Sequence, residues 1–403
     1  MVQTRAVPIY QLEEGVETFY VPRFEIKISG RDLPRDVVHD VMQVVYRDSI
    51  QEIDSFDLQI NNWDADTQAF KYVGVPGELE PESSSSPYAG IFDPGESLEV
   101  YMGYGNNLRL MMEGQITTLE PNFPSAGPPT LSVRGLNVLH SFRQKQHTWA
   151  WESVRDSDVA QELGQRPVTE ERPGLDIEVR VDDQAAGQEP EETFLFMNNQ
   201  YDIVFLMERA RRRGYSLYLD EERSDGQVER FLYFGPSHHI RDLTYELVWG
   251  QSLVQFRPTL TTANQVSQVT VRGWNRRSRQ AIEGTASWSD SDIEINQDQT
   301  AVARAIQGRH EVITDRPVHT VQEANALARD ILLEQLKEMV KGSGSTVGLP
   351  DLRAGRKVHV KQLGPRFSGE YFVTATTHTI GSGGYQTTFE ARREKGLEES
   401  SSS

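Results

Sequence analysis

One glycine-rich segment of the sequence has the composition of a phosphate-binding loop. Residues 342–348 read GSGSTVG, and the backbone amides of such a loop could surround a phosphate group. That chemistry requires the loop to follow a strand and to open a helix, so that the helix amides face the anion. Here a helical pattern precedes the glycines and a strand pattern follows them. The segment is therefore predicted to be a linker.

The other residue types that could do chemistry form no catalytic constellation. His238 and His239 are adjacent, so in a strand their side chains would point to opposite faces and could not easily share a metal ion. The sequence has no HExxH or GxSxG motif, and it has no cysteine to act as a nucleophile or metal ligand. Acidic residues are numerous but dispersed, so no catalytic carboxylate pair can be picked out. We predict no catalytic residue, no cofactor-binding residue, no cofactor and no metal ligand.

Three clusters have both a structural and a functional interpretation. Residues 211–213 are consecutive arginines, which could bind an acidic partner but also suit the last turn of a helix, where the helix dipole favours cations. Trp149 and Trp151 could form a sugar platform, although such residues more often belong to a core or an interface. The serines at 83–86 could dock a neighbouring molecule, whereas a solvated loop is the simpler interpretation.

The overall charge limits the class of partner. The 403 residues carry 41 basic and 60 acidic side chains, for a net charge of −19. Binding a nucleic-acid backbone needs clustered lysine and arginine, so direct nucleic-acid recognition is not expected. No apolar run follows a basic stretch at the N-terminus, and no window approaches the length of a membrane span. We therefore expect neither a signal peptide nor membrane insertion, and assembly in the cytoplasm.

Part of the sequence occurs twice, with a constant spacing of 260 residues. FDPGESLEV begins at position 92 and LRAGRKVHV at position 352. Downstream, the segment from Gly114 resembles the segment from Gly369, since both run glycine, strand, turn, strand, arginine. Two copies of one β-module usually build a scaffold. The matched positions are Gly95 and Gly355, Leu98 and Val358, and Val100 and Val360.

Hydrophobic periodicity predicts the elements that carry these motifs. Alternating apolar and polar residues separated by turn residues predict antiparallel strands at both ends of the chain. Between them, apolar residues from Ile203 to Ala210 recur at helical spacing and Gly214 ends the helix. A second helix is predicted over 320–341, where Thr320 and Glu323 fit a capping box.

The predicted fold is mainly β with α+β content, built as two duplicated antiparallel β-barrels plus a small α+β domain. The predicted parts are an N-terminal arm (1–20), a first barrel (21–145), the small α+β domain (146–245), a second barrel with the inserted helix 320–341 (246–395) and a disordered tail (396–403).

The C-terminal third of the chain, from GSGSTVGLPDLRAGRKVHV to FEARR, resembles the phage late control D family. These are hub proteins of contractile phage tails and related injection machines, similar to the N-terminal part of VgrG spike proteins. FDPGESLEVYMGYG resembles that family's first barrel, and the segment ending RRRGYSLYLD resembles its middle domain. VRGWNRRSRQAIEG, residues 271–284, resembles the strand that opens its second barrel. The resemblance covers roughly residues 20–395, and its motifs are structural.

The resemblance implies two tube-type barrels per chain and a homotrimer. Six barrels in a ring would adapt the sixfold tail tube to the threefold spike of a phage tail or phage-tail-like particle. The implied partners are the tail tube protein, a spike protein and other baseplate proteins. Full-length VgrG proteins continue into a β-helical needle, whereas this sequence has no run of regular short repeats, so the spike is expected to be a separate polypeptide. The helix 320–341 and the barrel edges are candidate interfaces, since an open edge strand is a pairing template. Acidic side chains in the lumen would repel DNA or acidic cargo.

A hydrolase remains the alternative class of function. A β-barrel enzyme acting on carbohydrate or peptide could use acids such as Glu99 or Asp315, because carboxylate enzymes often lack local motifs. The duplication and the resemblance favour a structural hub, so we predict that the chain is not an enzyme. An adhesion module would usually carry a secretion signal, which the sequence lacks.

Overall fold

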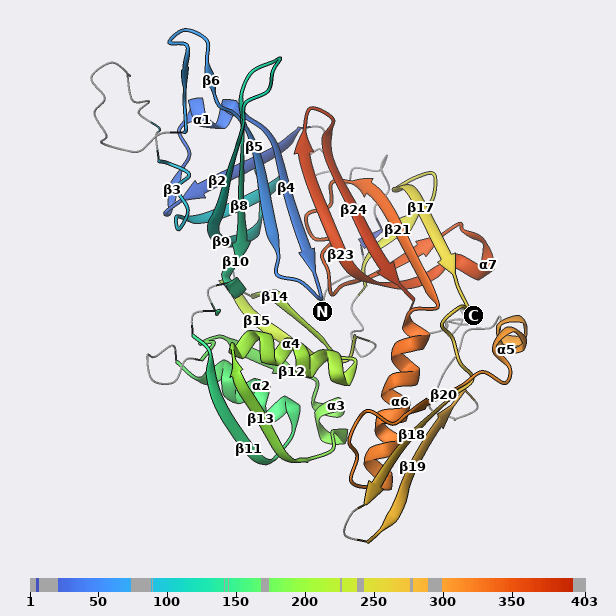
Figure 1. Ribbon diagram of the computed structural model, residues 1–403. Coiled ribbons are helices and arrows are strands. Elements are labelled where there is room, and N and C mark those ends of the chain that lie inside the picture. The colour runs from blue at the N-terminus through green and yellow to red at the C-terminus, as the bar shows by residue number, and fades with distance from the viewer. Residues whose placement is uncertain are drawn as a thin grey trace.

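The computed structural model describes residues 5–6, 21–73, 88, 90–140, 142–143, 145–167, 174–224, 227–237, 243–275, 278–288 and 299–393. Strands from the two ends of the chain form the upper part of Figure 1, and the smaller sheets and longer helices lie below them. His238 and His239, the serines at 83–86, most of the N-terminal arm and the tail lie outside the described residues. No helix of the described part is both long and apolar enough to cross a bilayer.

The first β-module surrounds one apolar core. Alternation places Phe56, Leu58 and Ile60 on the buried face of their strand, as the period of two predicts. The elements are β2 (Pro22–Ile28), β3 (Arg31–Asp32), α1 (Arg35–Asp40), β4 (Val41–Ser49), β5 (Ser55–Asn61), β6 (Trp63–Asp64), β7 (Ala69–Phe70), β8 (Ser97–Tyr104), β9 (Asn107–Asn122), β10 (Thr130–Asn137) and the 3-10 turn Val138–His140.

The second β-module surrounds a second apolar core, which includes Tyr371, Phe389 and Val360. The short strand β1 (Arg5–Ala6) pairs with its first strand. Its elements are β16 (Leu243–Val248), β17 (Leu253–Leu260), β21 (Val340–Val347), β22 (Lys357–Lys361), α7 (Gly364–Phe367), β23 (Gly369–Gly381) and β24 (Gly384–Arg392).

The strands of both modules belong to one large sheet, and the two predicted closed barrels are not observed among the described residues. In the first module the second edge of β4 pairs with β23 of the other module, so it is not available to close the barrel. In the second module, the strands that would have to pair to close a barrel are β16 and β17. They are connected only by a single bridge between Trp249 and Leu253, so this barrel is open as well. The fold is mainly β with a large, mostly antiparallel sheet.

Each module nevertheless arranges its strands in the same order. We number the six main strands of each module from one to six along the chain. In both modules they pair in the order two, three, six, five, four, one. This order is β4-β5-β10-β9-β8-β2 in the first module and β17-β21-β24-β23-β22-β16 in the second. One difference is that β2 is antiparallel to β8 whereas β16 is parallel to β22.

The repeated glycines make the same hydrogen bonds in both modules. The Gly95 amide donates to the carbonyl of Ile116 (2.8 Å), and the Ile116 amide donates back to the carbonyl of Glu96 (2.9 Å). The Gly355 amide donates to the carbonyl of Val373 (2.9 Å), and the Val373 amide donates to the carbonyl of Arg356 (2.8 Å). Both glycines have positive φ, 101° and 84°, a conformation that glycine adopts without strain. The repeat seen in the sequence is confirmed.

A β-bulge also recurs at one position in the two modules. The pairing of β9 with β10 skips Thr117, and the pairing of β23 with β24 skips Thr374. The hydroxyl of each threonine donates across the bulge, from Thr117 to the carbonyl of Arg134 (3.4 Å) and from Thr374 to the carbonyl of Glu390 (3.2 Å). A bulge bends a strand and increases its twist, so both modules bend at the same place.

The predicted match of Gly114 with Gly369 is wrong by two residues. Gly114 lies opposite Leu98, whereas Gly369 lies opposite Val360, the counterpart of Val100. A side chain at Gly114 would collide with the carbonyl of Leu136, while Gly369 has a φ of 138°. Two different local constraints therefore placed a glycine near the start of each hairpin.

The middle of the chain packs around an apolar cluster that includes Leu163, Leu206 and Phe234. Helix α4 ends at Gly214, which has a φ of 67° and caps the helix. The elements are β11 (His147–Val154), α2 (Asp156–Gln165), β12 (Glu178–Val181), α3 (Asp183–Gln188), β13 (Glu192–Gln200), α4 (Asp202–Arg213), β14 (Ser216–Ser224) and β15 (Gln227–Gly235).

A further small unit is inserted between β17 and β21. Helix α6 begins as predicted, with the Glu323 amide donating to the Thr320 hydroxyl (3.1 Å), but it ends at Lys337 rather than Lys341. Residues 271–275 lie in this unit and do not open the second module. The elements are β18 (Gln268–Asn275), β19 (Gln280–Ser287), α5 (Gln299–Ile306), β20 (His310–Ile313) and α6 (Val321–Lys337).

The predicted linker GSGSTVG is a strand. It forms most of β21, paired on both sides with β17 and β24. Side chains at Gly342 and Gly344 would collide with the rings of Phe256 and Phe389. These glycines therefore make room for aromatic core residues, and glycine content alone was a misleading signal.

The repeated glycines provide a matched test of packing. Gly95→Ala should cost about 1 kcal/mol, from left-handed strain alone, because no atom lies within 4 Å of the added methyl. Gly355→Ala should cost about 1–3 kcal/mol more, because its methyl would lie 2.4 Å from the ring of Tyr218 in the middle domain. Urea unfolding of the two variants measures the difference, and equal losses would contradict this packing.

Candidate functional site: the joint between the two β-modules

The two modules are joined along the edges of β4 and β23. Six residue pairs align in this antiparallel joint, from Ser49 opposite Ala375 to Val44 opposite Ile380. Strand β23 is long enough to serve both modules, because its first part pairs with β22 and its second part with β4, while β24 covers its other edge. Figure 1 shows β4 and β23 side by side at the centre of the upper sheet.

A buried carboxylate lies at this joint. Asp48 is 6% exposed, and its oxygens accept hydrogen bonds from the backbone amides of Ala354 (3.0 Å) and Thr376 (3.1 Å) and from the Thr376 hydroxyl. The Nε of Arg353 donates to the same carboxylate at 3.0 Å. All four donor groups belong to three residues of the second module, whereas the acid belongs to the first, so the charge is compensated only while the modules are joined.

Arg353 extends from the loop before Gly355 into the first module. Its guanidinium donates to the Tyr46 hydroxyl (2.7 Å) and to the Met111 carbonyl (2.6 Å). It also lies 4.6 Å from the centroid of the Tyr46 ring, a distance typical of a cation–π contact. We call Asp48, Arg353, Tyr46 and Met111 the joint cluster.

Two titratable groups, the half-buried Asp54 and the fully buried His378, flank the joint cluster. Burial, and secondarily the charge of Asp48, raise the pKa of Asp54 to about 7, although Arg353 and the Asn137 amide oppose this shift. Burial and the charge of Arg353 lower the pKa of His378 to about 3. The neutral His378 ring lies between the Tyr385 hydroxyl at Nδ1 and the Leu352 carbonyl at Nε2, each at 2.9 Å. We infer that Nε2 carries the proton, since a carbonyl can only accept.

The joint makes one polar surface out of the two modules. A row of cross-strand neighbours crosses it without interruption: Gln255, Ser345, Thr388, Thr377, Arg47 and Ser55. Arginines 47, 134 and 257 alternate on this surface with Asp57, Glu120 and Glu390, and Arg134 binds Asp57 and Glu120 at 3.0 Å each. A shallow groove lies over its second-module half. Its charges are balanced, in contrast to the net charge of −19.

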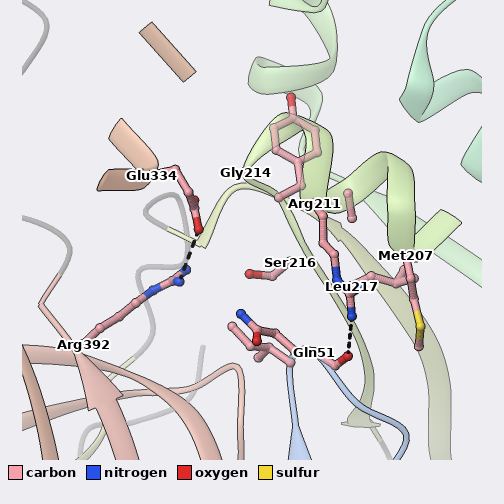
Figure 2. A pocket seen from close by; sticks show the side chains of 11 residues that line it. Gln51, Met207, Arg211, Gly214, Ser216, Leu217, Glu334 and Arg392 are labelled. Carbon is pink, nitrogen blue, oxygen red and sulfur yellow. Dashed lines mark hydrogen bonds and ion pairs between the residues drawn. The ribbon is translucent and has the colours of Figure 1, made fainter. Parts of the chain in front are cut away.

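A pocket below the joint is lined by four parts of the chain. Figure 2 shows Gln51 of the first module, Arg211 and Gly214 of the middle domain, Glu334 of α6 and Arg392 of β24 around it. Arg211 donates to the Gln51 carbonyl (3.2 Å), and Glu334 lies 4.0 Å from Arg392. These polar contacts hold the middle domain and the inserted unit against both modules.

Two of the three arginines at 211–213, Arg212 and Arg213, contact acids of the middle domain itself, while Arg211 contacts Gln51 of the first module. Burial alone would raise the pKa of Asp156, but the bonds and charges of Arg209 and Arg213 lower it overall. The guanidinium groups of Arg209 and Arg213 each lie 2.5 Å from the Asp156 carboxylate. The guanidinium group of Arg212 lies 3.9 Å from the Glu192 carboxylate. The structural interpretation, cations in the last helical turn, is therefore the better one.

The other predicted candidates lie apart from one another. Trp151 stacks on Phe205 (5.7 Å) within the middle-domain core, and Arg166 covers Trp149 (5.1 Å), so both tryptophans are packing residues. Glu99 accepts a hydrogen bond from Tyr101 (2.5 Å), and Asp315 is exposed. In the described part of the chain, no three His, Asp or Glu side chains are grouped as metal ligands would be.

The residues of the joint cluster were missed in the sequence. Asp48 and Arg353 are about 300 positions apart, and although Arg353 lies in the repeated segment LRAGRKVHV, nothing in that segment points to Asp48. The available signal was the apolar strand VMQVVYRDS, in which a single aspartate follows buried positions. A charge on a buried strand face needs a partner, but sequence patterning does not name that partner.

Breaking the joint cluster from one side should be costly. We expect Arg353→Leu to lower the free energy of unfolding by about 3–5 kcal/mol, because it leaves the Asp48 carboxylate buried and unpaired. Adding Asp48→Asn should recover more than about 1 kcal/mol of that loss. The matched pair Arg134→Leu and Asp57→Asn removes a more exposed ion pair and should show coupling below about 1 kcal/mol. Additive losses in urea unfolding at Asp48 and Arg353 would contradict this account.

The flanking groups predict opposite pH effects. His378 has a lowered pKa, so its contribution to stability is present above pH 6.5 and is lost as the pH falls toward 3. Asp54 has a raised pKa, so its contribution is present below pH 4 and is lost as the pH rises through about 7. His378→Gln should therefore weaken the loss of stability between pH 6.5 and pH 4, measured as urea midpoints. A steeper loss would contradict the assignment.

Comparison with known proteins places this fold among tail proteins. The 43 kDa tail protein of prophage MuSo2 from Shewanella oneidensis is 14% identical, with a TM-score of 0.63 over 93% of this chain and 98% of that one. A tail protein from Neisseria meningitidis is 14% identical, with a TM-score of 0.60 over 93% and 97%. An E. coli type VI secretion component, described as similar to T4 tail proteins gp27 and gp5, is 12% identical, with a TM-score of 0.54 over 92% and 78%.

At these identities the likeness shows the fold alone, and it confirms the resemblance to tail hub proteins at that level. A search of curated proteins finds no match. The family model of the Alg8 N-terminal domain matches residues 19–382, and because this match spans most of the chain, the chain belongs to the Alg8 N-terminal domain family.

Proposed function

We propose that this chain is a structural hub of a contractile injection apparatus, a phage tail or a phage-tail-like particle. Three copies would form a ring of six β-modules, in which the tube-type barrels close only as parts of the ring. The ring would join a sixfold tail tube on one side to a threefold spike on the other. Its partners would be the tube protein, a separate spike protein and other baseplate proteins, and assembly would be its whole function.

The observation that carries this proposal is the internal repeat. Two modules share strand order, the glycine hydrogen bonds of Gly95 and Gly355, and the bulges at Thr117 and Thr374. A chain that offers two similar modules side by side can present six similar surfaces from three copies. A closed ring requires a head-to-tail contact that rotation closes, and the joint already arranges two modules head to tail.

The polar surface across the joint suits the wall of a channel. Its side chains form one continuous polar row from Gln255 to Ser55, and three arginines on it are matched in number by three acids. On this proposal the lumen wall would be close to neutral, in place of the acidic lumen expected from net charge. No observation among the described residues favours a hydrolase, since Glu99 is bonded to Tyr101 and Asp315 is a single exposed acid.

Solution mass tests the proposal. Light scattering should give three times the chain mass of 45.7 kDa, for the protein alone or after addition of the spike protein of the same particle. Negative-stain images of the complex should show a ring that binds the tube protein on one face. A monomer that ignores both partners at all concentrations would overturn the hub assignment and reopen the search for an active site.

A further inference from the structure

The repeat gives each strand of the joint a counterpart elsewhere in the chain. Strand β4 is the second strand of its module, and β17 is the second strand of the other. Both carry a bulge at the same position, because the pairing of β4 with β5 skips Met42 and that of β17 with β21 skips Val254. Strands β23 and β9 are likewise both fifth, aligned by Thr374 and Thr117.

These counterparts have open edges. Among the described strands, β17 pairs only with β21, and the part of β9 beyond Ile116 pairs only with β10. Positions that are buried in the joint are more accessible on these strands: Pro121 is exposed and Pro258 half-buried, whereas their counterparts His378 and Tyr46 are fully buried. An open edge presents unpaired backbone groups to another strand.

We propose that a second copy of this chain covers these edges, with β17 of one copy pairing with β9 of the next in the register of β4 and β23. This inference rests on the proposed ring and names the strands that close it. Transferring the register residue by residue gives a seam with four central pairs. They are Thr261 with Thr118, Leu260 with Leu119, Thr259 with Glu120, and Pro258 with Pro121.

The side chains along this seam are complementary. Leu260 and Leu119 are each half-buried in the single chain, and they would form an apolar pair where the joint has Asp48 and Thr376. Arg257 would lie diagonally across from Glu120, within reach of a long side chain on neighbouring strands. Strand β17 and the second part of β9 each lack a paired strand on the edge that faces the seam. A second copy would therefore add backbone hydrogen bonds there without breaking any.

The seam should be weaker than the joint. Arg353 corresponds in the repeat to Asp93, and Asp48 corresponds to Leu260, so the buried ion pair has no equivalent. A proline in a strand is tolerated where its nitrogen faces away from the paired neighbour. Pro258 and Pro121 therefore remove two N–H donors from the open edges. The copies would then associate reversibly, while the modules within a chain stay joined.

Engineered disulfides test the register, and the absence of native cysteine makes the readout clean. Thr259→Cys with Glu120→Cys, oxidised by copper–phenanthroline, should give covalent dimers and trimers on a denaturing gel. The matched control is Arg47→Cys with Thr377→Cys, the equivalent pair inside one chain, which should give only monomers of altered mobility. Circular dichroism of each variant checks that it folds.

The outcomes separate this inference from the hub assignment. A trimer by light scattering together with a ladder that stops at trimer supports both. A trimer without cross-linked species overturns the seam and leaves the hub assignment intact. A protein that stays monomeric with the spike and tube proteins overturns both, and a ladder that continues beyond trimer overturns the closed ring.

Restoring the missing donors tests the weakness of the seam. Pro121→Val with Pro258→Val adds two N–H groups at the open edges, and each hydrogen bond contributes about 1 kcal/mol. The trimer should then persist at about tenfold or more lower protein concentration in a dilution series. An unchanged or higher dissociation concentration, with unfolding unaltered, would overturn the role given to the prolines.

Discussion

The structure depends on a charge that can be buried only if the two ends of the chain meet. Asp48 belongs to the first module, yet its hydrogen-bond donors, Arg353, Ala354 and Thr376, all belong to the second. A carboxylate without those donors would be left in an apolar sheet at a cost of several kcal/mol. The ion pair therefore selects one arrangement of the modules, and the pairing of β4 with β23 makes that arrangement a continuous sheet. The middle domain contacts the first module through Arg211 and Gln51, and the inserted unit contacts the second through Glu334 and Arg392.

Duplication and specialisation are both visible in the sheet. Backbone features repeat faithfully, as shown by the glycine bonds at Gly95 and Gly355 and by the threonine bulges. Side chains at the edges do not repeat, because the positions of Asp48 and Arg353 hold Leu260 and Asp93 in the other copy. Backbone geometry sets where modules can join, and side-chain chemistry sets how strongly each contact holds. One repeated module can thus supply a permanent contact and a reversible one.

The sequence predicted what local patterns determine. Alternation in SFDLQIN, the capping residue Thr320 and the helix stop at Gly214 were all read correctly, because each depends on a few neighbouring residues. The repeat around Gly95 was found because a positive φ leaves a glycine in both copies. The strand character of GSGSTVG was missed because its glycines leave room for the rings of Phe256 and Phe389, one of which is almost ninety residues away in the sequence. The joint cluster and the open sheet were missed for the same reason: a pairing edge is set by tertiary contacts that periodicity does not encode.

The length of chain between the two strands of the joint affects the protein during its synthesis. Strand β4 is complete at residue 49, but its partner ends at residue 381. At a translation rate of about 5–20 residues per second, roughly 330 further residues take about 15–65 s. Throughout that interval the apolar edge of the first module would be exposed on the ribosome with Asp48 unpaired, open to pairing with the same edge of a neighbouring nascent chain. The carboxylate that later fixes the joint would meanwhile keep that edge hydrated, so one residue would protect the nascent chain before it stabilises the finished one.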